Sequence, residues 1–414
     1  MKMIIFFGIA LVVLLTACGR GEPSVYVPIA QDVEPIANEL AIDSPPIMQI
    51  PQPPITQTEF YVYVPQAQFS PFVEYWLGQL TLEEKIGQLI MPRLPWQTTS
   101  VGQVEAWLEA VPFGGFILFS DNVQSIEQVQ QLTTGLQAQA RLPLLISTDE
   151  EGGRVSRVGR LFGGATPAAF DIGANAYDYG RENARRLLEL GINMNLAPVA
   201  DVWSNPANAV IGNRAFGHEA EAASLNVVAT VEGLQSGGVI ATLKHFPGHG
   251  DTYEDSHYQL AFHNHGVARF WEVESIPFTR GLWAGAKAVM TGHISTPYVS
   301  GHTALLPWME PWIESGNLPA TFSDFWLQDV LRGIMGFNGV IITDGLEMRA
   351  LTDHFTCGQI ALGAFLAGAD ILLIPANPVE AFDALLAGYH AGYFDMERLD
   401  ESVARILELK EPFQ

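Results

Sequence analysis

The sequence predicts an α/β fold, a single (β/α)8 TIM-type barrel, and three observations carry this prediction. Short, continuously apolar segments recur along the chain, as expected for parallel strands buried on both faces. Segments with apolar residues at helical spacing lie between them. Titratable residues stand at the carboxyl ends of several of the apolar segments, where such a barrel carries its functional groups. An open, doubly wound parallel sheet is the alternative.

The predicted strands are separated by enough chain for a helix between most neighbours. Gly191 and Gly336 directly follow two of the predicted helices, and Gly is common where helices end. The predicted strands are residues 87–91, 115–119, 144–149, 194–199, 241–245, 288–293, 339–344 and 370–375. The predicted helices are residues 125–140, 175–190, 220–235, 273–286, 324–335, 358–368 and 399–409.

Residues 1–17 predict a lipoprotein signal peptide. Lys2 places a positive charge before the apolar residues 4–15, a run too short to span a bilayer but suited to a signal-peptide core. The sequence Leu-Thr-Ala-Cys that ends at Cys18 resembles a bacterial lipoprotein box. We therefore expect export, cleavage before Cys18, and lipidation of Cys18 that anchors the protein to a membrane of the cell envelope.

Residues 18–67 predict a disordered tether, because Pro and acidic residues recur there and Arg20 is the only base. The folded catalytic domain is predicted to comprise residues 68–414, a length that suits one barrel with its loops. With Cys18 lipidated, Cys357 has no disulfide partner, and we expect it to be a buried or half-buried apolar residue.

The formal net charge of −24 disfavours several classes of partner. Binding to nucleic acid requires a basic surface, so no nucleic-acid partner is expected. Adsorption to anionic lipid is disfavoured for the same reason, and membrane contact is expected through the lipid anchor only. We expect a monomer.

The richest group of titratable residues lies between Lys244 and His257. These fourteen residues hold three His, three acids and a Lys, and they follow an apolar run that predicts a buried strand. Titratable residues at the point where a buried strand enters a Gly-rich loop are typical of an active-site rim. Asp149, His293 and Asp344 also end predicted strands, and Asp201 lies just past the fourth.

Four motifs in order give a more specific indication. They are the sequences at residues 149–157, 211–214, 244–257 and 342–348. Together with the barrel pattern, they resemble the family 3 glycoside hydrolases, specifically the single-domain bacterial β-N-acetylhexosaminidases. The resemblance extends from residue 82 to the last predicted helix. It implies a barrel without the second α/β domain that many family members carry.

The resemblance implies a retaining mechanism with a nucleophile and an acid/base group. It assigns Asp344 as the nucleophile and His257, oriented by Asp255, as the acid/base residue. An imidazole exchanges protons near neutral pH, and a carboxylate on one ring nitrogen fixes its tautomer. The residues alone leave His249 and Asp251 open as rivals. Gly345 departs from the family pattern, in which a second Asp often follows the nucleophile.

The resemblance also implies contacts to the sugar, and it implies no metal or cofactor. Glu150 and Glu151 are poor candidates for a metal site, because His ligands at helical spacing are missing. His293 and Asp201 are expected to be structural or supporting groups. The residues expected to bind the sugar are Asp149, Arg157, Arg214, Lys244 and His245.

The expected function is the exo-acting hydrolysis of terminal N-acetylglucosamine from cell-wall or chitin-type oligosaccharides. A phosphorylase or a β-glucosidase using the same site is an alternative, and a non-catalytic carbohydrate-binding lipoprotein is another. The sequence does not distinguish a hydrolase from a phosphorylase, and it does not identify the natural aglycone, the envelope type or the membrane leaflet.

Overall fold

The computed structural model describes residues 69–414, except for residues 165, 264 and 297–305. The described residues belong to one compact unit. The predicted signal peptide, Cys18 and the tether to residue 67 lie outside the described residues. Cys357 is half-buried, as the sequence predicts.

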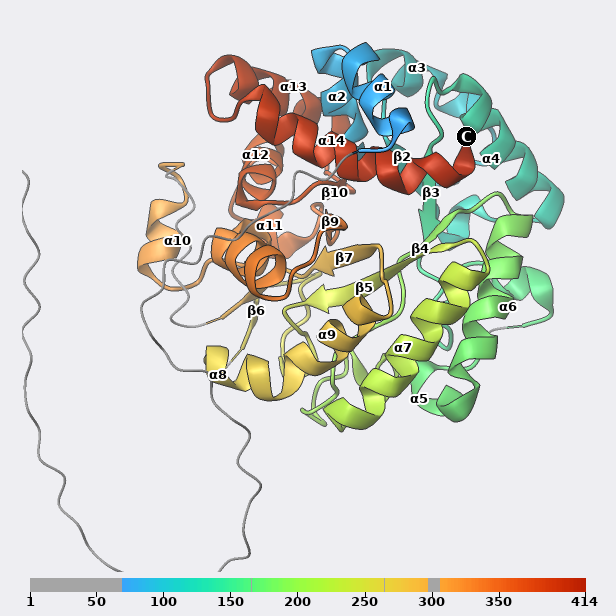
Figure 1. The fold of residues 1–414 in the computed structure, drawn as a ribbon, viewed down its shortest axis with the longest axis vertical. Helices are drawn as coiled ribbons and strands as arrows, with labels where there is room; N and C mark the ends of the chain where they lie inside the picture. Colours follow the sequence, from blue (N-terminus) through green and yellow to red (C-terminus); the bar gives the residue numbers. More distant parts are fainter. Residues whose placement is uncertain (1–68, 165, 264, 297–305) are drawn as a thin grey trace, which may run out of the picture. The chain divides into compact units, whose positions relative to one another are not determined.

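A curled parallel sheet forms the centre of the described structure (Figure 1). Its larger part pairs, in this order, β2 (Gly115–Ile117), β3 (Leu145–Thr148), β4 (Met194–Asn195), β5 (Ile240–Phe246), β7 (Ala288–Thr291) and β9 (Val340–Thr343). A separate parallel pair joins β1 (Ile90–Met91) to β10 (Leu372–Leu373), and another joins β6 (Ala261–Phe262) to β8 (Ile294–Ser295). The parallel strands and intervening helices confirm the α/β prediction.

Single parallel bridges extend the pairing at both edges of the larger sheet. Arg93, just after β1, bridges Ile117 in β2. Ile371, just before β10, bridges Ile342 in β9. The two-stranded pair therefore contacts the first and the last strand of the larger sheet.

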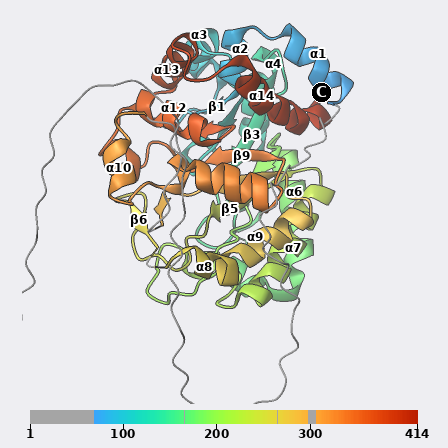
Figure 2. The same ribbon diagram turned by 60° about the vertical axis from the view of Figure 1, so that its left-hand side comes forward.

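Helices surround this sheet (Figures 1 and 2). None of the helices among the described residues has the length and apolar character needed to cross a bilayer. The longer ones are α1 (Pro71–Gln79), α2 (Leu82–Gln88), α4 (Ile126–Gln139), α6 (Ala176–Glu189), α7 (Ala220–Ser236), α9 (Ser275–Trp283), α12 (Cys357–Ala367), α13 (Pro378–His390) and α14 (Met396–Lys410). The shorter ones are α3 (Glu105–Ala110), α5 (Ala169–Ile172), α8 (Val267–Arg269), α10 (Glu310–Glu314) and α11 (Arg349–Thr352), and Phe325–Ile334 forms a π-helix.

Polar caps set several helix starts. Ser125 accepts a hydrogen bond from the Gln128 N–H at the start of α4. Thr356 accepts one from the Gln359 N–H at the start of α12, and the Gln359 side chain accepts one from the Thr356 N–H in return. Such caps satisfy N–H groups that have no partner within the helix.

The first predicted strand, residues 87–91, is partly wrong. Thr81 and Glu84 form a capping box that starts α2 at Leu82, and the helix continues through Gln88. Only Ile90 and Met91 pair as a strand. Gly87 is required at the end of α2, because a Cβ there would lie 2.4 Å from the Pro112 carbonyl oxygen. Sequence reasoning also missed α1, α3 and α13.

An aromatic cluster fixes the end of β5, from which the loop to His257 departs. The Phe246 ring is fully buried. It meets the rings of Phe270, Phe278 and Trp326 edge-on, at centroid distances of 5.7, 5.4 and 5.9 Å. Edge-to-face packing adds to the stabilisation from burial, so the strand end is held rigidly.

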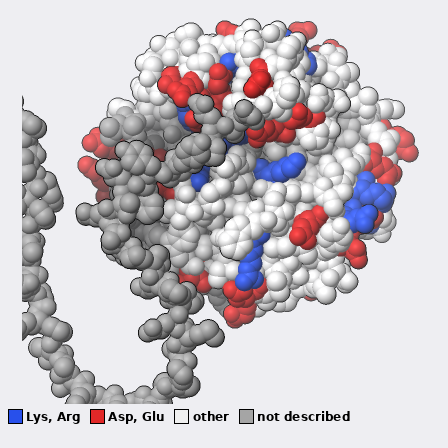
Figure 3. Space-filling model, viewed as in Figure 1, with Lys and Arg blue, Asp and Glu red and all other residues white. Residues whose placement is uncertain are grey.

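The helices at the two ends of the described chain lie side by side, with α14 against α1 and α2 (Figures 1 and 2). Lys85 of α2 and Asp400 of α14 form an ion pair of 2.6 Å. On the molecular face in Figure 3, acidic side chains form several groups and basic side chains are fewer, in keeping with the acidic composition.

Candidate active site

A polar cavity of about 450 Å³ lies at the carboxyl ends of the central strands. Asp149 follows β3, Lys244 and His245 lie in the last part of β5, and Asp344 follows β9. The structure brings together in this cavity all of the residues predicted to be catalytic or to bind the sugar except Asp255, namely Asp149, Arg157, Arg214, Lys244, His245, His257 and Asp344.

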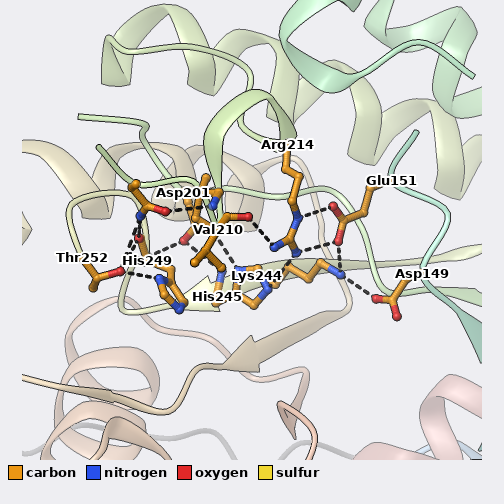
Figure 4. A network of polar contacts seen from close by, with 12 residues as sticks. Asp149, Glu151, Asp201, Val210, Arg214, Lys244, His245, His249 and Thr252 are labelled. Carbon is orange, nitrogen blue, oxygen red and sulfur yellow. Dashed lines mark hydrogen bonds and ion pairs between the residues drawn. The ribbon is translucent and has the colours of Figure 1, made fainter. Parts of the chain in front are cut away.

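Four alternating charges form a chain along one wall of the cavity (Figure 4). Lys244 Nζ lies 2.7 Å from Asp149 Oδ1 and 2.6 Å from Glu151 Oε1. Arg214 donates two hydrogen bonds to the Glu151 carboxylate, at 2.8 and 2.9 Å. Such a two-pronged contact fixes the guanidinium plane, so the cations are held in defined positions.

The opposite charges in this chain keep Glu151 and Lys244 ionised although both are buried. Burial acts to raise the pKa of Glu151, but the charges of Arg214 and Lys244 outweigh it and hold the pKa well below its usual range. Burial acts to lower the pKa of Lys244, but Asp149 and Glu151 hold it above its usual value. The cavity therefore offers charged hydrogen-bonding groups to a polar ligand.

His245 is oriented by Asp201. The Asp201 carboxylate lies 2.7 Å from His245 Nδ1 and accepts the backbone N–H of His245 at 3.1 Å. On the other side of the ring, Nε2 lies 3.4 Å from an Arg214 nitrogen. Burial acts to raise the pKa of Asp201, but His245 outweighs it and holds the pKa below its usual value. Asp201 is thus a supporting group for His245.

Asp344 stands at the end of β9 with its carboxylate fixed by the backbone. Its Oδ1 accepts the Gly345 N–H at 2.8 Å, and His293 Nε2 hydrogen-bonds the Gly345 carbonyl at 2.9 Å. Burial acts to raise the pKa of Asp344, but His245, His293 and the Gly345 N–H outweigh it and hold the pKa below its usual value. Asp344 is therefore ionised at neutral pH.

Asp255 and His257 form a pair on the loop after β5. Asp255 Oδ1 lies 2.7 Å from His257 Nδ1 and accepts the His257 backbone N–H at 3.0 Å. The His257 side chain is 60% exposed and lines the cavity, whereas Asp255 is not among the lining residues. This contact leaves His257 Nε2 as the second protonation site of the ring.

The two rivals on the same loop lie in different surroundings. Asp251 pairs with His265 at 2.7 Å and accepts a hydrogen bond from Ser204, and it does not line the cavity. His249 does line the cavity, but it is only 2% exposed. His257 is the more accessible of the two imidazoles.

Sequence reasoning named Arg157 as a site residue but missed Arg93, Phe119 and Glu347, which lie near it or near one another in the cavity wall. The Arg93 and Arg157 guanidinium groups lie over the Phe119 ring at 4.5 and 5.4 Å from its centroid. Glu347, which lies within the motif at residues 342–348, is 3.8 Å from Arg93. Their proximity depends on strands distant in sequence, so only the positions after predicted strands could have indicated them.

The two consecutive glutamates have their oxygens engaged by the protein. Glu150 accepts the backbone N–H groups of Arg157 and Val158 and the Ser156 hydroxyl. Glu151 is occupied by Arg214 and Lys244. Within the described ranges, no group of three or more His, Cys, Asp or Glu side chains is arranged to hold a metal ion.

A polar cavity at the carboxyl ends of parallel strands is the usual place of an active site in α/β enzymes. Residues 81–409 match the profile described as "Glycosyl hydrolase family 3 N terminal domain". The chain belongs to glycosyl hydrolase family 3.

Similar proteins include enzymes with named activities. The chain is 33% identical over 336 residues to Beta-hexosaminidase A of Pseudoalteromonas piscicida, covering 76% of this chain and 56% of that protein. It is 38% identical to the family 3 beta-N-acetylglucosaminidase structure from Paenibacillus, with a TM-score of 0.72, covering 80% of this chain and 62% of that one. The beta-glucoside phosphorylase BglX matches at 27% identity and a TM-score of 0.71, covering 83% and 61%. The chain thus spans about three fifths of the length of these relatives.

Proposed function

We propose that this protein is a retaining, exo-acting β-N-acetylhexosaminidase that hydrolyses terminal N-acetylglucosamine from cell-wall or chitin-type oligosaccharides. The observation that carries the proposal is that Asp344 and His257 line one cavity, with His257 hydrogen-bonded to Asp255. The resemblance to a beta-hexosaminidase and a beta-N-acetylglucosaminidase supports the choice of an amino sugar.

In the first step, the ionised Asp344 attacks the anomeric carbon and forms a covalent glycosyl-enzyme. The bond to the aglycone oxygen breaks, and the departing oxygen takes a proton from Nε2 of a protonated His257. Asp255 stabilises the imidazolium before the transfer through its contact with Nδ1.

In the second step, water attacks the same carbon from the side of the departed aglycone. Neutral His257 accepts the proton of this water, and the bond to Asp344 breaks with its electron pair returning to the carboxylate. Two inversions give net retention of the β configuration. His257 regains the proton that it gave up, so the cycle closes.

The remaining cavity residues bind the sugar. Asp149 accepts hydrogen bonds from sugar hydroxyls, and Lys244 and His245 donate to them. Arg157 and Arg214 frame the ring and its substituents. The buried ion pairs of Lys244 and Arg214 support this role, because they fix the donors before the substrate arrives.

The test is the hydrolysis of an aryl β-N-acetylglucosaminide, with the configuration of the first-formed sugar followed by NMR. A burst of β anomer, with single sugars released from a chitin oligosaccharide, supports the proposal. A faster release from the matching β-glucoside would favour the β-glucosidase alternative. Binding of the amino sugar without any turnover would favour a non-catalytic binding protein.

A phosphorylase is a second candidate, favoured by the acid/base residue being an imidazole. A neutral imidazole does not repel an incoming phosphate as a carboxylate would. The similarity to a beta-glucoside phosphorylase agrees with this candidate. Phosphorus NMR in phosphate buffer separates the two functions, because a phosphorylase yields the glycosyl phosphate and a hydrolase yields the free sugar.

We further propose that the eight parallel strands β1, β2, β3, β4, β5, β7, β9 and β10 close into a complete (β/α)8 barrel. The bridges from Arg93 to Ile117 and from Ile342 to Ile371 support this closure.

The cellular setting is also a proposal. The protein is exported with the signal peptide 1–17, lipidated at Cys18, and held at a membrane of the cell envelope by the tether 18–67 as a monomer. The sequence at residues 15–18 and the Pro-rich composition after it support this assignment.

A further inference from the structure

His249 is held rigidly in the cavity wall although the mechanism above does not use it. Its backbone N–H donates to Asp201 Oδ1 at 2.6 Å, and its carbonyl accepts from Asn208 Nδ2 at 2.7 Å. Its Nδ1 lies 2.5 Å from Thr252 Oγ1. Asp201, Asn208 and Thr252 are all buried, so these contacts fix the ring (Figure 4).

The other ring nitrogen, Nε2, is buried and has no hydrogen-bond partner within the described part of the chain. His249 is 2% exposed and is one of the residues that line the cavity. A buried polar atom without a partner is rare in folded proteins, and in a cavity wall it indicates a place for a ligand atom.

The hydrogen bonds of Thr252 determine whether His249 Nε2 is a hydrogen-bond donor or an acceptor. The Thr252 hydroxyl donates its single proton to the His249 carbonyl at 2.9 Å. Nδ1 must then carry the ring proton and donate to Thr252 Oγ1, because the hydroxyl proton is already used. Nε2 is left with a lone pair. Burial and the nearby His245 lower the pKa of His249 to about 4, so the ring stays neutral at physiological pH.

We propose that His249 Nε2 accepts a hydrogen bond from a hydroxyl group of the terminal amino sugar, which makes His249 a specificity-determining residue for that sugar. The proposal rests on the proposed hexosaminidase function. A sugar hydroxyl is a neutral donor of the size and polarity that this position accepts. A substrate without that hydroxyl leaves Nε2 unpaired, and such losses discriminate strongly between substrates.

The test combines deoxygenated substrates with two variants of His249. The substrates are an aryl β-N-acetylglucosaminide and its 3-, 4- and 6-deoxy analogues. His249→Asn keeps a polar group near Nδ1, within reach of Thr252, but leaves the Nε2 position empty. His249→Gln is the matched control, because its longer side chain places an amide at the Nε2 position.

For the wild type, we expect kcat/KM to fall for each analogue that loses a contact. For each analogue, the penalty is the ratio of kcat/KM for the parent glycoside to kcat/KM for the analogue. In His249→Asn, this penalty should shrink by roughly tenfold for one of the three deoxy analogues, while the penalties for the other two remain. In His249→Gln, the penalty at that position should return. The fluorinated analogue at that position should behave like the deoxy sugar in the wild type, because fluorine cannot donate a hydrogen bond.

Equal penalties at every position in the wild type and His249→Asn would overturn the role of His249 and leave the hexosaminidase function intact. A wild-type protein that does not cleave the parent glycoside would overturn both. If His249→Asn does not fold, as judged by its melting transition, His249→Ala gives the same comparison.

Discussion

Asp149, Lys244, His245 and Asp344 were predictable because each follows or ends a buried strand, and the carboxyl ends of parallel strands meet at one end of a curled sheet. Glu151 and His249 do not end predicted strands, and the sequence indicated a contact to the sugar for neither of them; it named His249 only as a rival for the acid/base role. Glu151 becomes the partner of Arg214 through a contact that spans 63 positions of the chain. The pairing of Glu151 with Arg214 and the unpaired Nε2 of His249 can be recognised only in the folded structure.

The role proposed for His257 predicts a dependence on the leaving group. His257→Ala should lose far more kcat/KM on natural disaccharides than on aryl glycosides with acidic phenols, because only poor leaving groups need a proton. With acidic phenols, the glycosyl-enzyme should accumulate, and azide should restore turnover and yield the β-glycosyl azide. Asp255→Ala should show a weaker form of this pattern.

Equal losses on good and poor leaving groups, without rescue by azide, would show a binding role for His257. His249 and Asp251 would then have to be tested as the acid/base residue. His390, at the end of α13, provides a matched control for loss of an imidazole: His390→Ala should leave both substrates unaffected.

Replacing Glu151 should lower the stability of the fold. Glu151→Gln leaves Lys244 and Arg214 buried without their shared carboxylate, and breaking such a buried pair costs about 3 kcal/mol in the free energy of unfolding. Glu182→Gln is the control, because Glu182 also pairs with two cations, Arg185 and Arg186, but at the surface. Urea unfolding that shows similar small changes in both variants would contradict this account of the network.

At the scale of elements, local signals predicted helices better than the first strand. Ser125 and Thr356 cap α4 and α12 where the sequence placed their starts, to within a residue. The first strand was misplaced because the apolar run near Ile90 overlaps a helix started by Thr81. Two-residue strands such as β1 and β10 have too few residues for periodicity to identify their bounds, and their pairing is decided by tertiary contact.

The buried Lys410 at the end of helix α14 should give the protein an unusual dependence of stability on pH. Lys410 is fully buried with Gln88 as a hydrogen-bond partner, and burial lowers its pKa to about 7. In the unfolded chain its pKa is about 10.4. Between these values the unfolded state binds more protons, so this residue destabilises the fold most below pH 7 and progressively less as the pH rises toward 10.

Lys410→Met should therefore raise the free energy of unfolding most at pH 6 to 7, with a gain that shrinks toward pH 10. Urea titrations at several pH values measure this difference. The exposed Lys287, replaced in the same way, should show no such trend. A gain for Lys410→Met that is independent of pH would contradict a buried, titrating ammonium group.

At the scale of the whole molecule, the proposed lipid anchor at Cys18 predicts that membrane attachment can be removed without loss of the folded domain. Wild-type protein should fractionate with membranes and partition into detergent, and Cys18→Ser should stay unlipidated. A chain that starts at Phe69 should be soluble and as active as the full protein, because the residues 81–409 that match the family lie within it. Loss of folding in that chain would place the domain boundary earlier, and a wild-type protein in the soluble fraction would rule out the anchor.

The alternation of apolar and helical segments was enough to predict the α/β class. The contacts of the β1–β10 pair with β2 and β9 depend on single bridges, which the sequence did not indicate. Such contacts between the first and last parts of a chain have no local signature. The reaction that the protein catalyses has even less of a local signature in the sequence, since one fold supports many reactions.

The most direct test of the central claim is to trap the glycosyl-enzyme with a 5-fluoro N-acetylglucosaminyl fluoride and to locate the label by peptide mass spectrometry. A retaining mechanism with Asp344 as the nucleophile predicts one labelled peptide, modified at Asp344, and no labelling in Asp344→Asn. Asp353, an exposed carboxylate at the end of α11, is the control: Asp353→Asn should label normally. Label on another residue, or a burst of α rather than β product from the unmodified enzyme, would contradict the account.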